Sequence, residues 1–528
     1  MGTSARVRRP SQPGHDNEQR EAAVESASLA EPVHGIVVED KGLKKNAISF
    51  VSNVVIGVAS TAPAYSLAAT LGYIALVGGL GVQSPAVILV CFFPMAAIAM
   101  AYYYMNRADP DCGTTFTWMT RAMGPWAGWQ GGWAIVVADV LVMPSLASVA
   151  GVYTCSLVGV NNPSNLAVTT IGIAWIVIMT VICYIGIEIS AATQRFLLAM
   201  EFATLIAFSV VALIKVYVDH PSHSMEPMLS WFNPFEISSV NALVGGVLLA
   251  VFIYWGWDSG VTVNEETEDS STAPGRAAIV STFVLVGIYL LVATAAQAFG
   301  GVMSLANNPS DVLAPLGKGV LGSPLDKILI IAVLSSASAS TQTTILPTAR
   351  TTLSMARMKA IPRQFGNVHP RFLSPGFSTI WMGVVSTLVY VLLSVTSPVN
   401  LIGDAFTSLA LTIAFYYGFT GFACVIFYRR ELLKSIKNFV YIGVFPFSGG
   451  AVLTYILYKA VRVYSKPHAG FAKPFLGIGS PIAIALLMII LGIVLMIIQR
   501  ITMPEFFKRK TEVVDPSVLA TAPAGRTS

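Results

Sequence analysis

Long apolar runs alternate with short polar stretches over most of this chain. A helix that spans a membrane needs about 20 mostly apolar residues, and the chain contains repeated runs of that length. The predicted spans are 47–77, 84–105, 125–158, 167–188, 194–217, 240–265, 277–300, 326–355, 376–396, 400–427, 439–462 and 479–501. The pattern therefore predicts an all-α polytopic membrane protein with about twelve transmembrane helices.

The two ends of the chain differ from this pattern. Residues 1–46 and 502–528 are polar and charged, and we expect them to form tails outside the bilayer, the first of them disordered. No loop within 47–501 is long enough to hold a hydrophobic core of its own. We therefore expect one transmembrane domain and no attached enzyme.

Composition supports a surface that faces lipid. Only 11% of the residues are charged and 55% are hydrophobic, whereas a soluble domain carries about 25% charged residues. The net charge of +5 is small for 528 residues, so we expect no nucleic-acid partner. The five cysteines form no CxxC pair and the histidines have no ligand partner at useful spacing, so we expect no metal site and no cofactor.

The basic residues predict the orientation in the membrane. An even number of spans places both tails on one side, and Lys and Arg are enriched in cytoplasmic loops. The distribution of Lys and Arg favours cytoplasmic termini. One predicted outer loop, which contains Lys466 and Lys473, is an exception to this distribution. We expect a multi-pass protein of the cell membrane.

The first predicted span contains a proline within a run of small residues, from Gly57 to Ser66. Pro63 lacks a backbone donor and disrupts the preceding turn. Irregular backbone at membrane depth persists only where it is buried in protein or lines a cavity. By itself, the motif fits a simple kink as well as a functional break.

The sixth predicted span contains a carboxylate, Asp258, between Gly256 and Gly260. Carboxylates inside a membrane are rare and are usually functional. The alternative is that Asp258 caps a half-helix or forms a hydrogen bond within the bundle.

Together, the two interruptions say more than either alone. They fall in the first span of each of two consecutive sets of five, and carriers built from inverted repeats place broken helices at corresponding positions. The free amides of a half-helix suit a carboxylate, and free carbonyls suit an ammonium group. The sequence thus indicates a carrier of small amine-bearing solutes.

Four ordered stretches resemble the amino acid–polyamine–organocation permeases. They carry the similarity across the first nine spans, and their order is more specific than any single motif. The stretches are Pro110–Phe116 with Gly124–Trp133, Gly186–Gln194, Tyr254–Asp258 with Asn264–Ala277, and Arg350–Arg371.

The resemblance implies a LeuT-type fold, with inverted five-helix repeats at about 47–217 and 240–427 and two additional helices at about 439–501. It also implies a substrate site between the two breaks. The substrate carboxylate would meet the amides of Ala64, Tyr65 and Ser66. The ammonium group would meet carbonyls near Ser60, Thr61, Phe252, Ile253 and Trp255, with Asp258 beside them.

One departure from the family pattern affects this prediction. Relatives usually have a glycine-rich first break, whereas this chain has Ala62, Pro63 and Ala64. Because Pro63 cannot donate a hydrogen bond, a substrate without a carboxylate becomes more plausible.

Coupling to an ion requires a titratable or ion-binding group inside the membrane. Glu201 lies well within its span and can bind a proton, or can coordinate a cation together with the hydroxyls of Ser335, Ser336 and Ser338. A buried, hydrogen-bonded structural glutamate is the alternative. Asp139 is a second candidate, and sodium remains an alternative to the proton.

Two acids near the inner end of the sixth span have a different predicted role. Glu265 and Glu266 are expected to form gate or loop ion pairs, with Arg276 or with the basic cluster at 350–371. The leading functional hypothesis is amino acid uptake by proton symport. The alternatives are a polyamine or organic-cation permease or exchanger, and a substrate sensor on a permease scaffold.

Overall fold

The computed structural model describes residues 40–511 except 161, 310, 397, 468 and 470–472. Twelve helices in this part of the chain are long and apolar enough to cross a membrane. Each of the twelve predicted spans coincides with one of them. The prediction of an all-α polytopic membrane protein is therefore confirmed.

The helices of the first half, in chain order, are α2 (Phe50–Ser60), α3 (Pro63–Leu76), α4 (Ser84–Ala108), α5 (Thr115–Met123), α6 (Pro125–Leu157), α7 (Asn165–Ile185) and α8 (Ile187–Val218). Two short 3-10 helices, η1 (Leu229–Phe232) and η2 (Pro234–Glu236), lead to the second half. It contains α9 (Val240–Tyr254), α10 (Ser259–Thr262), η3 (Asn264–Glu266), α11 (Ala273–Asn307), α12 (Leu313–Leu321), α13 (Asp326–Arg357), η4 (Arg363–Gly366), α14 (Gly376–Thr396) and α15 (Pro398–Phe427). The remaining elements are η5 (Leu432–Lys434), α16 (Ile436–Asn438), the π-helix η6 (Phe439–Val444), α17 (Phe445–Tyr464), α18 (Ser480–Thr502) and α19 (Pro504–Phe507).

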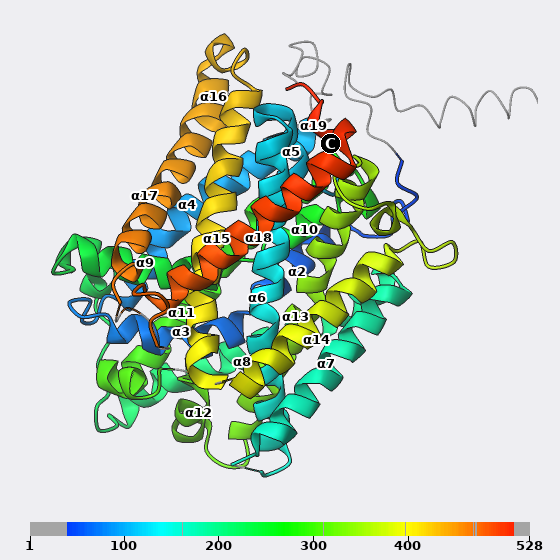
Figure 1. Cartoon of the computed structure of the whole chain (residues 1–528). Helices are drawn as coiled ribbons and strands as arrows, with labels where there is room; N and C mark the ends of the chain where they lie inside the picture. Colours follow the sequence, from blue (N-terminus) through cyan, green and yellow to red (C-terminus); the bar gives the residue numbers. More distant parts are fainter. Residues whose placement is uncertain are drawn as a thin grey trace, which may run out of the picture. The chain divides into compact units, whose positions relative to one another are not determined.

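Broken spans occur where the sequence predicts them. α2 and α3 together form the first span, and α9 and α10 form the sixth. α6 and α13, the third spans of the two five-helix sets, pack along each other in the middle of the bundle (Figure 1). This arrangement agrees with the LeuT-type fold.

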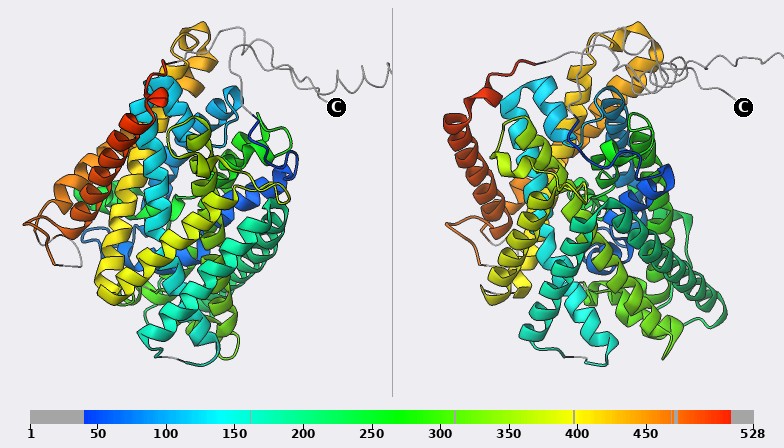
Figure 2. Two further views of the ribbon diagram at one scale, coloured as in Figure 1. Left: turned by 45° about the vertical axis from the view of Figure 1, so that its right-hand side comes forward. Right: turned by 90° about the vertical axis from the view of Figure 1, so that its right-hand side faces the viewer.

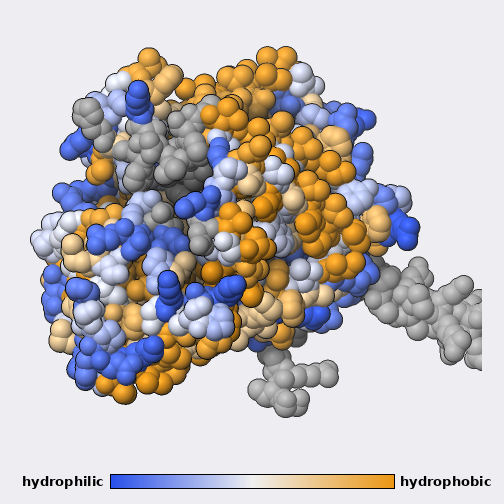
Figure 3. Space-filling model, turned by 90° about the horizontal axis from the view of Figure 1, so that it is seen from below, coloured by the Kyte–Doolittle hydropathy of each residue, from blue (hydrophilic) through white to orange (hydrophobic). Residues whose placement is uncertain are grey.

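The last span lies at the periphery. α18 is the most apolar of the twelve spans and few of its residues are buried, and it runs along the outside of the bundle in each view (Figure 2). An apolar, exposed helical face is what a lipid-facing helix requires. The end of the molecule seen in Figure 3 carries hydrophilic patches between broad hydrophobic areas.

Short segments outside the predicted spans also pack into the bundle. Lys41 and Leu43, expected in the N-terminal tail, are 2% and 5% exposed. Phe506 and Phe507 of α19, expected in the C-terminal tail, are buried, and Phe506 stacks on Phe116 of α5 with ring centroids 5.7 Å apart. Short segments on both sides of 47–501 therefore pack against the helices of the bundle.

Both described ends of the chain lie at one end of the bundle. Glu505 of the C-terminal segment pairs with Lys359, which follows α13, and the carbonyl of Lys41 accepts a hydrogen bond from Arg357 at the C-terminus of α13. We call this the Lys41 end.

Candidate functional site

The first break is a sharp turn between two helices. α2 ends at Ser60, and Ala62 adopts a left-handed conformation, with φ of 48°, immediately before α3. Pro63 occupies the first turn of α3, where its missing N–H would have no partner within the helix in any case. The interruption that Pro63 predicts is therefore a true break rather than a kink.

The second break depends on a glycine. α9 ends at Tyr254 and α10 begins at Ser259, and between them Gly256 has φ of 119°. A Cβ atom at Gly256 would lie 2.8 Å from the carbonyl oxygen of Ser60. Both the backbone conformation and the close approach of the first break therefore require glycine here.

The two breaks meet each other. The hydroxyl oxygens of Ser60 and Ser259 lie 2.7 Å apart. Ser340 of α13 donates to the carbonyl of Ser60 over 3.0 Å. Thus α2, α10 and α13 converge at one buried point of the bundle.

The N-terminus of α3 is occupied by a side chain from another helix. The backbone N–H of Ala64 donates to Oε1 of Glu201 on α8 over 2.7 Å, and Ser336 of α13 donates to the same oxygen over 2.8 Å. The N–H of Tyr65 donates to the Ser336 hydroxyl over 3.2 Å. Glu201 is fully buried. Because the Ala64 amide donates to it, its carboxylate faces the partial positive charge of the helix terminus.

This arrangement changes the predicted recognition of a substrate carboxylate. The amides of Ala64 and Tyr65 already have protein partners, and the N–H of Ser66 donates to the carbonyl of Ala62 over 2.7 Å. A substrate carboxylate can therefore use the first turn of α3 only by displacing Glu201 or Ser336.

The two predicted partners of Glu201 on α13 behave differently. Ser336 contacts Glu201, as described above, whereas Ser335 donates to the carbonyl of Ala332 one turn earlier in its own helix. The structure therefore brings Ser336 to Glu201 but records no hydrogen bond between Ser335 and Glu201.

The carbonyls predicted to meet an ammonium group have partners as well. The carbonyl of Thr61 accepts from the Ser66 hydroxyl over 2.6 Å, and that of Ile253 accepts from the Tyr289 hydroxyl over 2.6 Å. Tyr289 lies on α11, and no pattern around this lone tyrosine in the sequence distinguishes it from a packing residue. The carbonyl oxygens have a second lone pair each, which leaves capacity for a ligand.

Asp258 lies in a ring of aromatic hydroxyls. Its carboxylate accepts from Tyr417 over 2.7 Å and, over longer distances, from Tyr416 (3.4 Å) and Tyr102 (3.5 Å). The indole N–H of Trp255 donates to the Tyr416 hydroxyl over 2.5 Å. Asp258 therefore forms a hydrogen-bonded network with α4 and α15, which was the alternative interpretation of its sequence position.

Asp139 belongs to this second acidic region rather than to the Glu201 site. It lies on α6, accepts from Thr348 of α13 over 2.6 Å, and interacts electrostatically with Asp258. Two separate buried acidic sites therefore flank the breaks, one at Glu201 and the other at Asp139 and Asp258.

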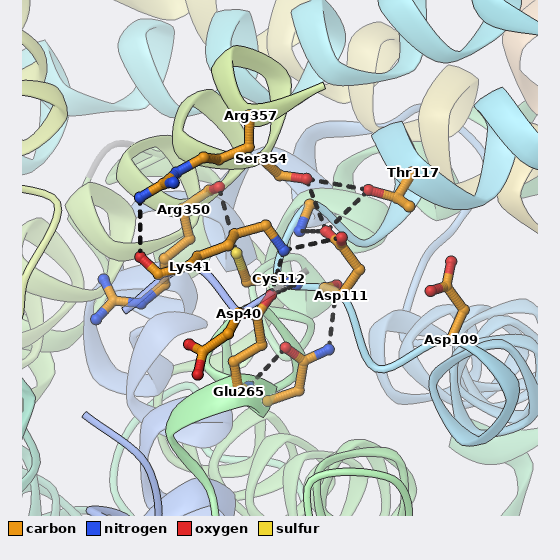
Figure 4. Close-up of polar contacts among 12 residues, drawn as sticks. Asp40, Lys41, Asp109, Asp111, Cys112, Thr117, Glu265, Arg350, Ser354 and Arg357 are labelled. Atoms are coloured by element: carbon orange, nitrogen blue, oxygen red, sulfur yellow. Dashed lines mark hydrogen bonds and ion pairs between the residues drawn. The ribbon is translucent and has the colours of Figure 1, made fainter. Parts of the chain in front are cut away.

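The Lys41 end is closed by buried ion pairs (Figure 4). The ammonium group of Lys41 lies 2.8 Å from Asp111 and 2.5 Å from Glu265. Asp111 also accepts from Thr117 and from Ser354, which join α5 and α13 to the cluster. Burial by itself would raise the pKa of Asp111, but the Lys41 ammonium group and these hydrogen bonds outweigh it and hold the pKa well below its usual range.

A second pair completes this closure. Arg350 of α13 and Glu266 of η3 form a bidentate pair with N–O distances of 2.6 and 2.9 Å, and both side chains are almost completely buried. The prediction that Glu266 pairs with the basic cluster at 350–371 is thereby confirmed. For Glu265, the partner is Lys41, which the sequence places in a tail.

The same cluster contains a triad with metal-ligand geometry. The ligand atoms of Asp111, Cys112 and Glu265 lie within 4.8 Å of one another. The Lys41 ammonium group, however, already contacts both carboxylates. The Lys41 ammonium group therefore takes the place at the two carboxylates that a metal ion would otherwise occupy.

A cavity of about 300 Å³ lies on the other side of the breaks, between α3, α9, α15 and α17. Its lining includes Thr70, Tyr73, Phe252, Thr407 and Tyr464. Phe252 is in the last turn before the second break, and its ring packs edge-on against Tyr65 with centroids 6.4 Å apart. The cavity is mainly apolar and has the size of a site for a small solute.

The sequence of this chain is similar to those of known transporters. A family model described as amino acid permease matches residues 45–494 of the chain. An uncharacterized transporter of Mycobacterium tuberculosis is 28% identical over 58% of this chain and 64% of its own length. The matched region thus spans less than two thirds of that relative.

Two further relatives have more specific descriptions. A vacuolar cationic amino acid transporter of Arabidopsis thaliana is 23% identical over 69% of this chain and 62% of its own length. A low-affinity putrescine importer of Escherichia coli is 22% identical over 60% of this chain and 70% of its own length.

Proposed function

Because the chain belongs to the amino acid permease family, we propose that it is a secondary transporter that carries amino acids across the cell membrane by proton symport. The observation that supports this proposal most is the meeting of the two broken helices at Ser60 and Ser259. Broken helices expose backbone groups at the membrane midplane, where a zwitterion can be bound with few charged side chains.

The closed Lys41 end supports alternating access around this site. Ion pairs close one side of the breaks, and the cavity lined by Phe252 lies on the other side. We propose that the Lys41 end is cytoplasmic, in accordance with the basic residues near both termini. A solute would then enter through the cavity and leave after the ion pairs have separated.

A polyamine or other organic cation is the second candidate substrate. The specific observation in its favour is that Glu201 already occupies the amide of Ala64. A substrate without a carboxylate could bind without displacing Glu201. The aromatic and acidic groups around Trp255 and Asp258 also suit a cation.

Uptake into liposomes that contain the purified full-length protein tests this function. We expect accumulation of labelled leucine or ornithine when the outside is one pH unit more acidic than the lumen, and collapse of the accumulation when the proton gradient is removed with an ionophore. Uptake of labelled putrescine tests the second candidate substrate. Protein-free liposomes are the control. Absence of uptake of all three solutes by monodisperse protein would contradict the proposal.

A further inference from the structure

Glu201 caps a helix to which it does not belong. α3 contains 14 residues, and its own N-cap residue, Ala62, has no side chain that could accept a hydrogen bond. The carboxylate from α8 takes this role at 2.7 Å from the Ala64 nitrogen. A carboxylate at this position is favoured by the helix dipole and by the unsatisfied amides.

The cap is incomplete on its other side. Oε2 of Glu201 is buried and has no hydrogen-bond partner among the described residues. A buried carboxylate oxygen without a partner is costly. Oε2 is therefore the oxygen at which a proton can bind, and a protonated Glu201 is a weaker acceptor for the Ala64 amide than the carboxylate is.

The groups that face Glu201 define what can neutralise it. They are the Ala64 amide of α3 and the Ser336 hydroxyl of α13, which both donate to it, whereas the hydroxyl of Tyr289 on α11 donates to the carbonyl of Ile253. In the described part of the chain, no lysine, arginine or histidine pairs with Glu201. A proton is the simplest source of positive charge at this site.

We propose that Glu201 holds the place of the substrate's carboxylate, and that a carboxylate-bearing solute binds the Ala64 amide only after Glu201 has taken up one proton. This inference rests on the proposed transport function and specifies its coupling. One proton enters from the solvent and binds to Glu201. The side chain, now a neutral acid, then moves away from the Ala64 amide. The solute's carboxylate replaces it, so the helix terminus faces one negative charge before and after the exchange.

The inference distinguishes two classes of solute. A zwitterionic amino acid must displace Glu201, so its binding takes up one proton. An amine that lacks the carboxylate leaves Glu201 in place, and its binding takes up none. When one proton is linked to binding, the dissociation constant of the amino acid rises about tenfold for each pH unit above the pH at which Glu201 of the free protein loses its proton.

The test counts protons for matched ligands. Two pairs differ only by the carboxylate: ornithine and putrescine, and leucine and 3-methylbutylamine. Calorimetry of the purified full-length protein in two buffers of different ionisation enthalpy gives the protons bound per ligand. We expect about one proton for the amino acid of a pair and none for the amine, and none for either ligand with Glu201→Gln.

A matched control lies on the same helix. Glu188→Gln makes the same change at an exposed glutamate that pairs with Lys44, and it should leave the proton count unchanged. Ser336→Ala removes the other partner of Oε1 but keeps the acid, so the linkage should persist with an altered affinity.

The remaining outcomes contradict the inference in distinguishable ways. Binding of an amino acid without proton uptake, equal uptake for both members of a pair, or binding of amines alone would overturn the role of Glu201 and leave the transport function standing. Binding of none of the four ligands by folded protein would overturn the proposed function and, with it, this inference.

Discussion

Glu201→Gln should abolish proton-driven accumulation while solute exchange continues. A glutamine keeps the size of the side chain and can still accept from the Ala64 amide, but it cannot bind a proton. One coupled proton supports about a tenfold accumulation per pH unit at zero membrane potential. We therefore expect about tenfold accumulation for the native protein and a ratio near one for the variant.

Two measurements in the same liposomes separate coupling from folding. Counterflow, in which unlabelled solute inside drives entry of labelled solute, needs the binding site but no proton gradient, and it should survive in Glu201→Gln. Glu188→Gln should retain both activities, because Glu188 is exposed at the end of α8. Gradient-driven accumulation by Glu201→Gln equal to that of the native protein would remove Glu201 from the coupling.

Lys41→Met should open the Lys41 end. The change leaves Asp111 and Glu265 buried and without their common counter-charge, and removal of one partner of a buried pair costs about 3–5 kcal/mol. The closed conformation should therefore become about 100-fold or more less favoured relative to one in which these carboxylates reach water.

Cys112 provides a readout of this opening. Its thiol is fully buried beside the cluster, so labelling by a maleimide reports exposure, provided that the other four cysteines have been replaced by alanine. Burial raises the pKa of the Cys112 thiol and the Lys41 ammonium group counteracts this shift. Loss of Lys41 alone would thus slow the reaction, and faster labelling can only report opening.

Lys44→Met is the matched control for this experiment. Lys44 pairs with Glu188, but both side chains are about half exposed, and such surface pairs contribute only about 0–1 kcal/mol. Its labelling rate should stay within a few-fold of the native rate. An unchanged rate in Lys41→Met would show that the ion pairs do not hold this end closed.

The apolar pattern predicted the spans well because length and hydropathy determine which segments can cross a bilayer. Pro63 and Gly256 likewise marked both breaks, since each residue has a backbone requirement that is visible in the sequence. The short elements escaped prediction. Phe506 and Phe507 lie in a polar segment, and they are buried in a hydrophobic cluster with residues of α5, α6, α13 and α18, which come together only in the folded chain.

For the candidate site, the sequence suggested individual residues but few of the contacts between them. Glu201 and Ser336 were expected to act together, and they do contact each other. Their contacts with the first turn of α3 were missed, because a helix cap supplied by the side chain of another helix leaves no local pattern at Ala62 or Ala64. The partner of Glu265 was missed as well: Lys41 lies 224 positions away, in a segment that resembles a tail.

Uptake by an Ala64→Phe variant tests most directly whether solute passes between the two breaks. Ala64 is fully buried at the first turn of α3, so a phenyl ring there should fill the space next to the breaks. Gly287→Phe on α11 is the control, since a side chain at Gly287 meets nothing within 4 Å. We predict accumulation of ornithine, leucine or putrescine by the native protein and by Gly287→Phe, and at least a tenfold loss in monodisperse Ala64→Phe. Equal uptake by Ala64→Phe and the native protein would contradict a path between the broken helices.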